Sequence, residues 1–327
     1  MISYETISEL VEIAIQKNEK ISEIVLQDQI VQMEKPRDEL LKRMEENLDV
    51  MLDSIEKGSQ KGVKSKSGLT GGDAYLLKQK IEADSFLTGP LMANAIQMAI
   101  AVSEINAAMG KIVASPTAGS CGILPAALGS MIKIQKTAKA DAVLSLFTAG
   151  AIGMVIANKA SIAGASGGCQ AECGSASAMA AACIVELSGG TTQMVQESVA
   201  IALKCILGLV CDPVAGLVEI PCIKRNASGV TLAFTAAEMA LAGIKSIIPV
   251  DEVILTMKRI GDSMPSSLKE TAEGGLAVTQ TGIELQKKYS AQLMSTSVFL
   301  VQVAAHAVKK YQLFIGYIQI YSKNYSF

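Results

Sequence analysis

The sequence predicts an all-α protein: a multilayered helical bundle with a central core of apolar helices. Half of its 327 residues are hydrophobic, yet aromatic residues make up only 4% and tryptophan is absent. Alanine, glycine, methionine, isoleucine and leucine supply the apolar content, and such side chains suit close helix packing better than sheet surfaces. Few segments alternate apolar and polar residues as strands do, and no β–α–β unit with a glycine turn appears. A dinucleotide-binding domain is therefore not expected.

Residues 1–57 are predicted to form an N-terminal helical region that packs on the core. One helix is expected over Glu5–Gln16, where apolar residues recur on one face. Another is expected over Lys35–Lys57, whose opposite face is highly charged and therefore typical of a solvated surface. The boundary to the next region follows this second helix.

Residues 58–289 are predicted to form a helical domain that contains the loops with reactive side chains, and residues 290–327 an atypical C-terminal tail. From residue 84 onward, long apolar segments alternate with short loops of glycine, proline and serine. The expected helices are 89–109, 122–137, 140–162, 170–187, 191–209, 228–244 and 249–259. The apolar run Ala142–Ala157 is shorter than the ~20 residues of a membrane span, so it indicates a buried helix and no membrane association.

Charge and cysteine content narrow the class of protein further. Lysine and arginine number 29 against 31 acidic residues, a net charge of −2. No basic stripe indicates nucleic acid as a partner, and the acidic N-terminus lacks a signal core, so a cytoplasmic protein is expected. Seven cysteines in a reducing compartment indicate metal ligands or buried apolar residues rather than disulfides.

Residues 58–72 form a loop rich in glycine, serine and lysine. Composition favours a linker, although glycine backbone and lysine charge would also suit an anion.

The loop at 115–122 precedes a predicted helix and contains three hydroxyl side chains, Ser115, Thr117 and Ser120. Free N–H groups at a helix start bind carboxylates and phosphates well. A plain capping turn would use the same residue types. The sequence leaves both interpretations open.

Two further loops contain cysteines. Glycines at 164–168 lead into a predicted helix, so Cys169 lies near its positive end, which favours the thiolate, and Cys173 follows one turn later. Cys211 and Cys222 lie beside prolines 213 and 221, near loops or helix ends.

The remaining cysteines are weaker ligand candidates. Cys183 and Cys205 lie within apolar helical segments and are interpreted as core residues. Cys121 belongs to the loop at 115–122. For any single cysteine, a buried structural role is the alternative to a ligand.

Thiolate ligands favour zinc, copper(I) or an iron–sulfur cluster. Zinc sites of the C-x-x-C type are absent, and the one histidine, His306, lies in an expected C-terminal helix far along the sequence. Three separated cysteines can hold a four-iron cluster by three corners, which leaves one iron open as a Lewis acid. Spacing alone allows this without requiring it.

As a set, these loops resemble the alpha part of the iron–sulfur L-serine dehydratases. The matching stretches are SGLTGGDA at 67–74, SPTAGS at 115–120, GGCQAE at 167–172, CDPVAGLVEIPCIKRN at 211–226 and EGGLA at 273–277. The resemblance covers about residues 3–285. It implies an all-helical lyase that deaminates L-serine to pyruvate and ammonia, in amino-acid degradation and gluconeogenesis. It also implies a [4Fe-4S] cluster on Cys169, Cys211 and Cys222.

The resemblance also implies roles for polar residues. Ser115 and Thr117 would bind the substrate carboxylate, Lys66 and Ser67 would close the anion side, and Asn226 would orient substrate or ligand. Glu172, or a group on a partner chain, would be the base.

The chain departs from the family pattern in three respects. Cys121 and Cys173 replace small or aliphatic residues, and the tail after about residue 289 differs and lacks a cysteine. No Ser-Ser-His-Thr stretch is found. The beta part is therefore expected as a separate chain in a hetero-oligomer.

Two other classes remain as alternatives. A pyridoxal-phosphate dehydratase would use a Schiff-base lysine, such as Lys66, but needs an α/β scaffold. A non-catalytic helical protein would use a cluster or zinc for structure or redox sensing.

Overall fold

The computed structural model describes residues 4–296 and 319–321, with side chains for residues 4–290. Its helices are α1 (Ile7–Lys17), α2 (Ile21–Met33), α3 (Arg37–Gly58), α4 (Asp73–Glu82), α5 (Gly89–Ala107), α6 (Ile123–Ile134), α7 (Lys139–Lys159), α8 (Gly164–Gly167), α9 (Ser175–Leu187), α10 (Thr192–Lys204), α11 (Cys222–Leu241), α12 (Val250–Ser263) and α13 (Gln280–Thr296). Shorter helical turns are η1 (Ala118–Ser120), η2 (Gln170–Gly174), η3 (Val214–Gly216), η4 (Ser266–Leu268) and η5 (Gly275–Val278). The prediction of an all-α, multilayered bundle is confirmed.

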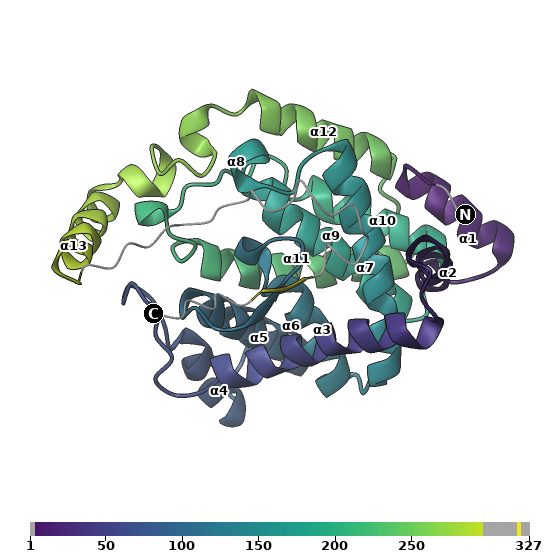
Figure 1. Ribbon diagram of the computed structural model, residues 1–327, viewed down its shortest axis with the longest axis horizontal. Coiled ribbons are helices and arrows are strands. Elements are labelled where there is room, and N and C mark those ends of the chain that lie inside the picture. Colours follow the sequence, from purple (N-terminus) through teal and green to yellow (C-terminus); the bar gives the residue numbers. More distant parts are fainter. Residues whose placement is uncertain (1–3, 297–318, 322–327) are drawn as a thin grey trace.

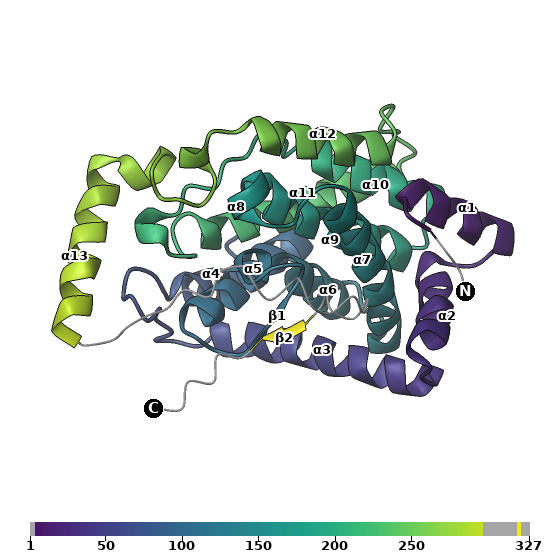
Figure 2. The same ribbon diagram turned by 45° about the horizontal axis from the view of Figure 1, so that its top comes forward.

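The alanine-rich helix α9 forms the centre of the bundle. It contacts α6, α7, α10 and α11. All eleven residues from Ser175 to Val185 are buried, and most of them have small side chains. Figures 1 and 2 show α9 and α11 between α12 at one edge and α3 at the other. Small residues permit this density: a Cβ on Gly229 of α11 would collide with Ile123 of α6. The low aromatic content of the sequence thus reflects close helix–helix contact.

The N-terminal helices pack on this core. Helix α1 contacts α10 and α12, and α2 contacts α7. Thr6 and Glu9 form a capping box at the start of α1, which satisfies its free N–H groups. Asp251 of α12 then accepts hydrogen bonds from the backbone of Ile7 and from Ser8.

One described helix, α7, is long and apolar enough to cross a membrane by length and composition. Inside the bundle, however, 72% of its most apolar window is buried. The expectation of a buried helix over this run is confirmed.

Several helix boundaries differ from prediction. Helix α11 begins at Cys222 rather than 228, because Pro221 occupies the position before its first turn instead of breaking it. The segment 170–174 is a π-helical turn rather than regular α-helix. Helices α4 and α13 were not predicted, and strand β1 (Ile112–Ala114) pairs antiparallel with β2 (Gln319–Tyr321).

The interpretation of Cys205 as a core residue is wrong, whereas that of Cys183 is confirmed. Helix α10 ends at Lys204, so Cys205 lies beyond its last turn and is exposed. Cys183, in the middle of α9, has no exposed surface. The prediction for His306 lies outside the described residues.

Candidate functional site

Four loops from distant parts of the sequence meet beside the central helices. They are residues 115–122, 164–174, 211–222 and 264–275. Two of them are joined by backbone hydrogen bonds: Cys211 N donates to Leu268 O at 2.9 Å, and Glu270 N donates to Cys211 O at 2.8 Å. The polypeptide holding Cys211 is therefore fixed on both sides.

Cys169 precedes the π-helical turn η2 and is 3% exposed. The preceding Gly168 has a φ of 77°, and a Cβ there would collide with Met264 and Leu209 O, so only glycine fits. The sulfur of Cys169 lies 3.4 Å from that of Cys173, at hydrogen-bond distance. This contact lowers the pKa of the Cys169 thiol; burial opposes the shift, and Arg225 reinforces it.

The sulfur of Cys211 lies close to the backbone of Gly164. A Cβ at Gly164 would lie 3.0 Å from the sulfur of Cys211, 3.0 Å from Oε2 of Glu172 and 3.2 Å from Oε2 of Glu270. These contacts show that one thiol and two carboxyl groups surround the same point. Only a residue without a side chain leaves room for them.

Cys222 is the first residue of α11 and is 8% exposed. Burial raises the pKa of its thiol, and neighbouring Cys169 and Glu172 add to the effect. Burial likewise raises the pKa of Cys211, with Glu172 and Cys169 again contributing. The three predicted ligands, Cys169, Cys211 and Cys222, therefore share one electrostatic neighbourhood.

Asn226 holds two of these loops together. Its amide donates to the carbonyl oxygens of Gly119 at 2.8 Å and Cys222 at 2.9 Å, and its oxygen accepts from Gly122 N at 2.8 Å. Both polar atoms of its side chain thus form hydrogen bonds with backbone groups. The residue orients the chain around Cys222 and the loop at 115–122.

The loop at 115–122 faces the cysteines through Glu172. Thr117 Oγ1 donates to Glu172 Oε1 at 2.9 Å and lies 3.1 Å from Ser120 Oγ. The Ser115 hydroxyl is fully buried and has no hydrogen-bond partner among the described residues. None of these hydroxyls caps η1 or α6, so the capping interpretation of this loop is wrong.

Glu172 is the most strongly perturbed carboxyl group of the site. Burial raises its pKa to about 8, and the nearby Cys169 and Glu270 act in the same direction. A Cβ at Gly119 would lie 3.0 Å from Glu172 Oε2. The carboxyl group therefore fills the space between the loop at 115–122 and the cysteine loops.

The segment at 58–72 does more than connect two helices. Ser67 is 5% exposed, and its hydroxyl donates to Glu219 Oε2 at 2.9 Å, as does that of Thr70 at 2.6 Å. The anion that this loop binds is thus a carboxylate of the cysteine-bearing loop at 211–222. The Lys66 side chain is exposed, so the structure does not bring it to the other predicted residues.

Sequence reasoning missed three charged residues of the site, Asp212, Arg225 and Glu270. Arg225 forms an ion pair with Asp212 at 2.8 Å and donates to Val210 O. Asp212 also accepts from Leu276 N at 2.8 Å, and Gly275, at a φ of 57°, leaves room for it. The stretch at 273–277 was therefore a usable signal, whereas nothing in the sequence marked Glu270.

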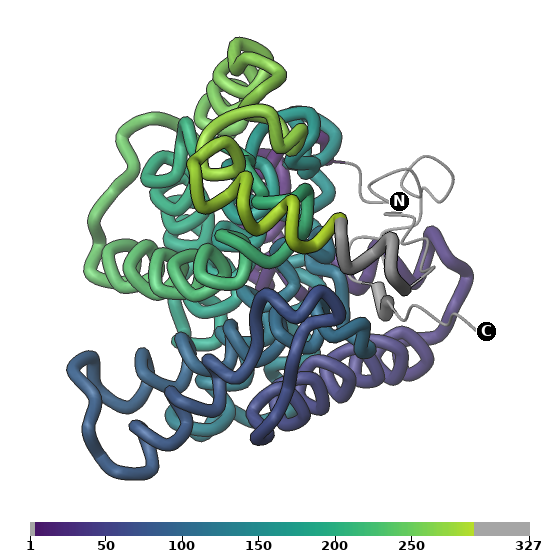
Figure 3. Tube along the Cα trace, turned by 90° about the vertical axis from the view of Figure 1, so that its left-hand side faces the viewer, coloured from purple at the N-terminus to yellow at the C-terminus, as the bar shows by residue number. Residues whose placement is uncertain are grey.

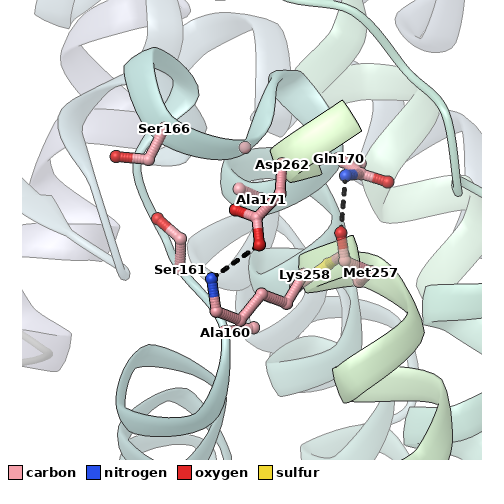
Figure 4. A pocket seen from close by; sticks show the side chains of 9 residues that line it. Ala160, Ser161, Ser166, Gln170, Ala171, Met257, Lys258 and Asp262 are labelled. Atoms are coloured by element: carbon pink, nitrogen blue, oxygen red, sulfur yellow. Dashed lines mark hydrogen bonds and ion pairs between the residues drawn. The ribbon is translucent and has the colours of Figure 1, made fainter. Parts of the chain in front are cut away.

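Behind the Cys169 turn lies a hollow of about 320 Å³ (Figure 4). Gln170 spans its wall: its amide donates to Met257 O at 2.9 Å, and its oxygen accepts from Gly208 N at 2.9 Å. Lys258 and Asp262, both on α12 like Met257, form an ion pair that also lines the hollow. No cysteine lines this hollow, so it lies outside the cysteine site; Gln170 braces the turn from this side.

Within residues 4–290, no group of three histidine, cysteine or acidic side chains is arranged to hold a single metal ion. The donor set nevertheless fits a larger group: three buried thiols, none in a disulfide, converge from separate loops. Sulfur-only donors favour iron–sulfur clusters over hard cations.

Comparison with known proteins identifies the family. A family model described as "Serine dehydratase alpha chain" matches residues 16–277. The chain belongs to this family. Its members are lyases, so the predictions of family and enzyme class are confirmed.

Two alpha chains of this serine dehydratase family match over nearly their whole length. "Probable L-serine dehydratase, alpha chain" of Bacillus subtilis is 51% identical over 87% of this chain and 95% of its own. "L-serine dehydratase, alpha chain" of Peptoniphilus asaccharolyticus is 41% identical, over 87% and 97%. "L-serine dehydratase 2" of Escherichia coli is 40% identical over 74% of this chain but only 54% of its own.

Proposed function

We propose that this chain is the catalytic alpha subunit of an L-serine dehydratase, converting L-serine to pyruvate and ammonia. The observation that carries the proposal is the convergence of three buried cysteines opposite a loop with an unpartnered hydroxyl, Ser115. The names of the alpha-chain relatives supply the substrate. The described fold is all-α apart from one pair of three-residue strands, and so does not favour the pyridoxal-phosphate alternative, which needs an α/β scaffold.

We further propose that Cys169, Cys211 and Cys222 hold a [4Fe-4S] cluster. When bound by three cysteines, such a cluster supplies an open iron that acts as a Lewis acid toward the substrate hydroxyl. The chain itself excludes water around this position, because each of the three cysteines is at most 8% exposed. A cluster held by thiolates would require a reducing setting, which is why we propose a cytoplasmic location.

The loop at 115–122 would bind the substrate carboxylate. The Ser115 hydroxyl is buried without a partner, so an incoming carboxylate oxygen would satisfy it. Further backbone N–H groups of the loop would assist, although that of Gly122 already donates to Asn226.

Glu172 would take the proton from the substrate Cα. It lies between that loop and the cysteines, and the Thr117 hydroxyl donates to one of its oxygens. Asn226 positions both loops but does not touch substrate in this scheme.

A separate beta chain would complete the enzyme. Alpha-chain relatives are covered at 95% and 97% of their length, whereas a protein named "L-serine dehydratase" from Streptomyces coelicolor is covered at 40% of its own length. The longer protein therefore carries a further part that the alpha chains lack.

The Cys211→Ala variant tests the cluster assignment. We expect loss of iron, sulfide and broad visible absorbance together with loss of serine-dependent pyruvate formation, while far-ultraviolet circular dichroism stays helical. Cys183→Ala, which changes a buried cysteine outside the site, is the matched control and should retain iron. Wild-type iron content and turnover in Cys211→Ala would refute the assignment.

A further inference from the structure

Cys169 and Cys173 form a close pair of thiols. Their sulfur atoms lie 3.4 Å apart, and no other two cysteines among the described residues share a hydrogen bond. The pair spans the π-helical turn η2, which puts both side chains on the same side of the chain. Cys121, Cys183 and Cys205 lack such a neighbour.

The geometry is close to that of a disulfide. A disulfide bond is about 2.05 Å long, so the sulfurs need to approach by about 1.4 Å. Rotation of the two side chains can supply a movement of this size. Both residues are at most 3% exposed, so the pair reacts with itself more readily than with thiols of other molecules.

We propose that Cys173 is a resolving thiol for Cys169, and that a peroxide converts the pair into a disulfide when the chain is free of metal. Two S–H bonds break and one S–S bond forms. The two electrons and two protons pass to hydrogen peroxide, whose O–O bond breaks to give two molecules of water. The oxidant is thus a peroxide, and the chain supplies both sulfurs.

The pairing protects Cys169. Without a neighbouring thiol, a cysteine oxidised to the sulfenic acid proceeds to sulfinic acid, which ordinary thiols do not reverse. With Cys173 at hand, oxidation stops at a disulfide that a thiol reductant reopens. The disulfide is independent of the proposed function, but its consequence rests on that function: the oxidised chain would retain only Cys211 and Cys222 for a cluster.

The experiment treats the full-length, metal-free chain with hydrogen peroxide and digests it, unreduced, with a protease that cleaves after glutamate. Cleavage after Glu172 separates the two cysteines, so their peptides stay joined only through sulfur. We expect joined peptides lighter by two hydrogen atoms, and the same product in Cys121→Ala and in Cys183→Ala, which excludes bonds to the second cysteine of either peptide. Separate peptides, or a bond lost in Cys121→Ala or Cys183→Ala, would overturn the proposal.

A second measurement tests protection. After peroxide, the wild-type chain and Cys173→Ala are reduced and supplied with iron and sulfide without oxygen. We expect the wild type to regain the iron content of its untreated control, and Cys173→Ala to keep a sulfinic acid at Cys169 and lose that capacity. Equal recovery by both proteins would overturn the resolving role. If the untreated wild type forms the disulfide with peroxide but never binds iron, the disulfide proposal stands and the cluster proposal fails.

Discussion

At the scale of single residues, Glu172 joins the two halves of the site. Thr117 contacts it from the loop at 115–122, while Cys169 and Glu270 act on it from the cysteine side. Gly164 and Gly119 leave the space that its oxygens occupy. The position of the Glu172 carboxyl group therefore depends on these two glycines as well as on its polar neighbours.

Replacing Glu172 by glutamine should separate proton transfer from cluster binding. Loss of a positioned base costs typically 10²- to 10⁴-fold, so we expect kcat to fall by about that factor while iron content stays at the wild-type value. The exposed Glu273→Gln is the control. Undiminished kcat in Glu172→Gln would transfer the role of base to another group, such as one on the partner chain.

Gly164→Ala should damage the site without removing any ligand. Its Cβ would lie 3.0 Å from the Cys211 sulfur, closer than ordinary contact, so we expect reduced iron and sulfide per chain. Ala165→Ser adds one atom at the exposed neighbouring position and should bind iron normally. Iron and sulfide analysis measures this, on variants whose melting temperatures match that of the wild type. Wild-type iron content in Gly164→Ala would show that the space around Gly164 accommodates a methyl group.

At the scale of elements, buried polar contacts tie the N-terminal helices to the core. Glu186 of α9 accepts hydrogen bonds from Thr148 of α7 at 2.8 Å and from the backbone of Ser22 of α2 at 3.3 Å. Burial raises the pKa of this carboxyl group. One side chain thus links three helices and senses pH.

The pH dependence follows from the direction of that shift. Because the pKa of Glu186 is higher in the folded than in the unfolded chain, the protonated group adds stability below the unfolded value of about 4.3. This contribution is lost as pH rises through the folded pKa. As pH rises above the unfolded value, the free energy of unfolding should therefore fall more steeply for the wild type than for Glu186→Gln. Urea unfolding at several pH values measures this; parallel curves would contradict it.

The sequence predicted elements better than contacts. Helical spacing and loops rich in glycine or proline were enough to find α5, α7, α9 and α12 and to place Cys169, Cys211 and Cys222 at element ends. The start of α11 was missed because proline both ends a helix and begins one. Glu270 was missed because its place beside Cys211 depends on a backbone pairing between distant loops.

At the scale of the whole molecule, the site lies where several helices end. Helix α13 stands at one edge of the bundle in Figures 1 and 2, and it crosses in front of the other helices when viewed from that side in Figure 3. The short turn η5 before α13 is bound to Asp212 through Leu276. The edge of the molecule and the cysteine loops are thereby linked.

Dependence on a second chain is the prediction at this scale. We expect the isolated chain to turn over L-serine weakly or not at all, and a beta chain to raise pyruvate formation at unchanged iron content. Titration of the beta chain against a fixed amount of this chain measures the effect. Saturating turnover without any partner would contradict the expected hetero-oligomer.

The small sheet has a practical consequence for anyone handling this protein. Strand β1 runs directly into the loop at Ser115, and its partner β2 lies at residues 319–321. Substitutions at residues 319–321 would act on the strand beside this loop, so engineering of the protein should leave that short segment unchanged.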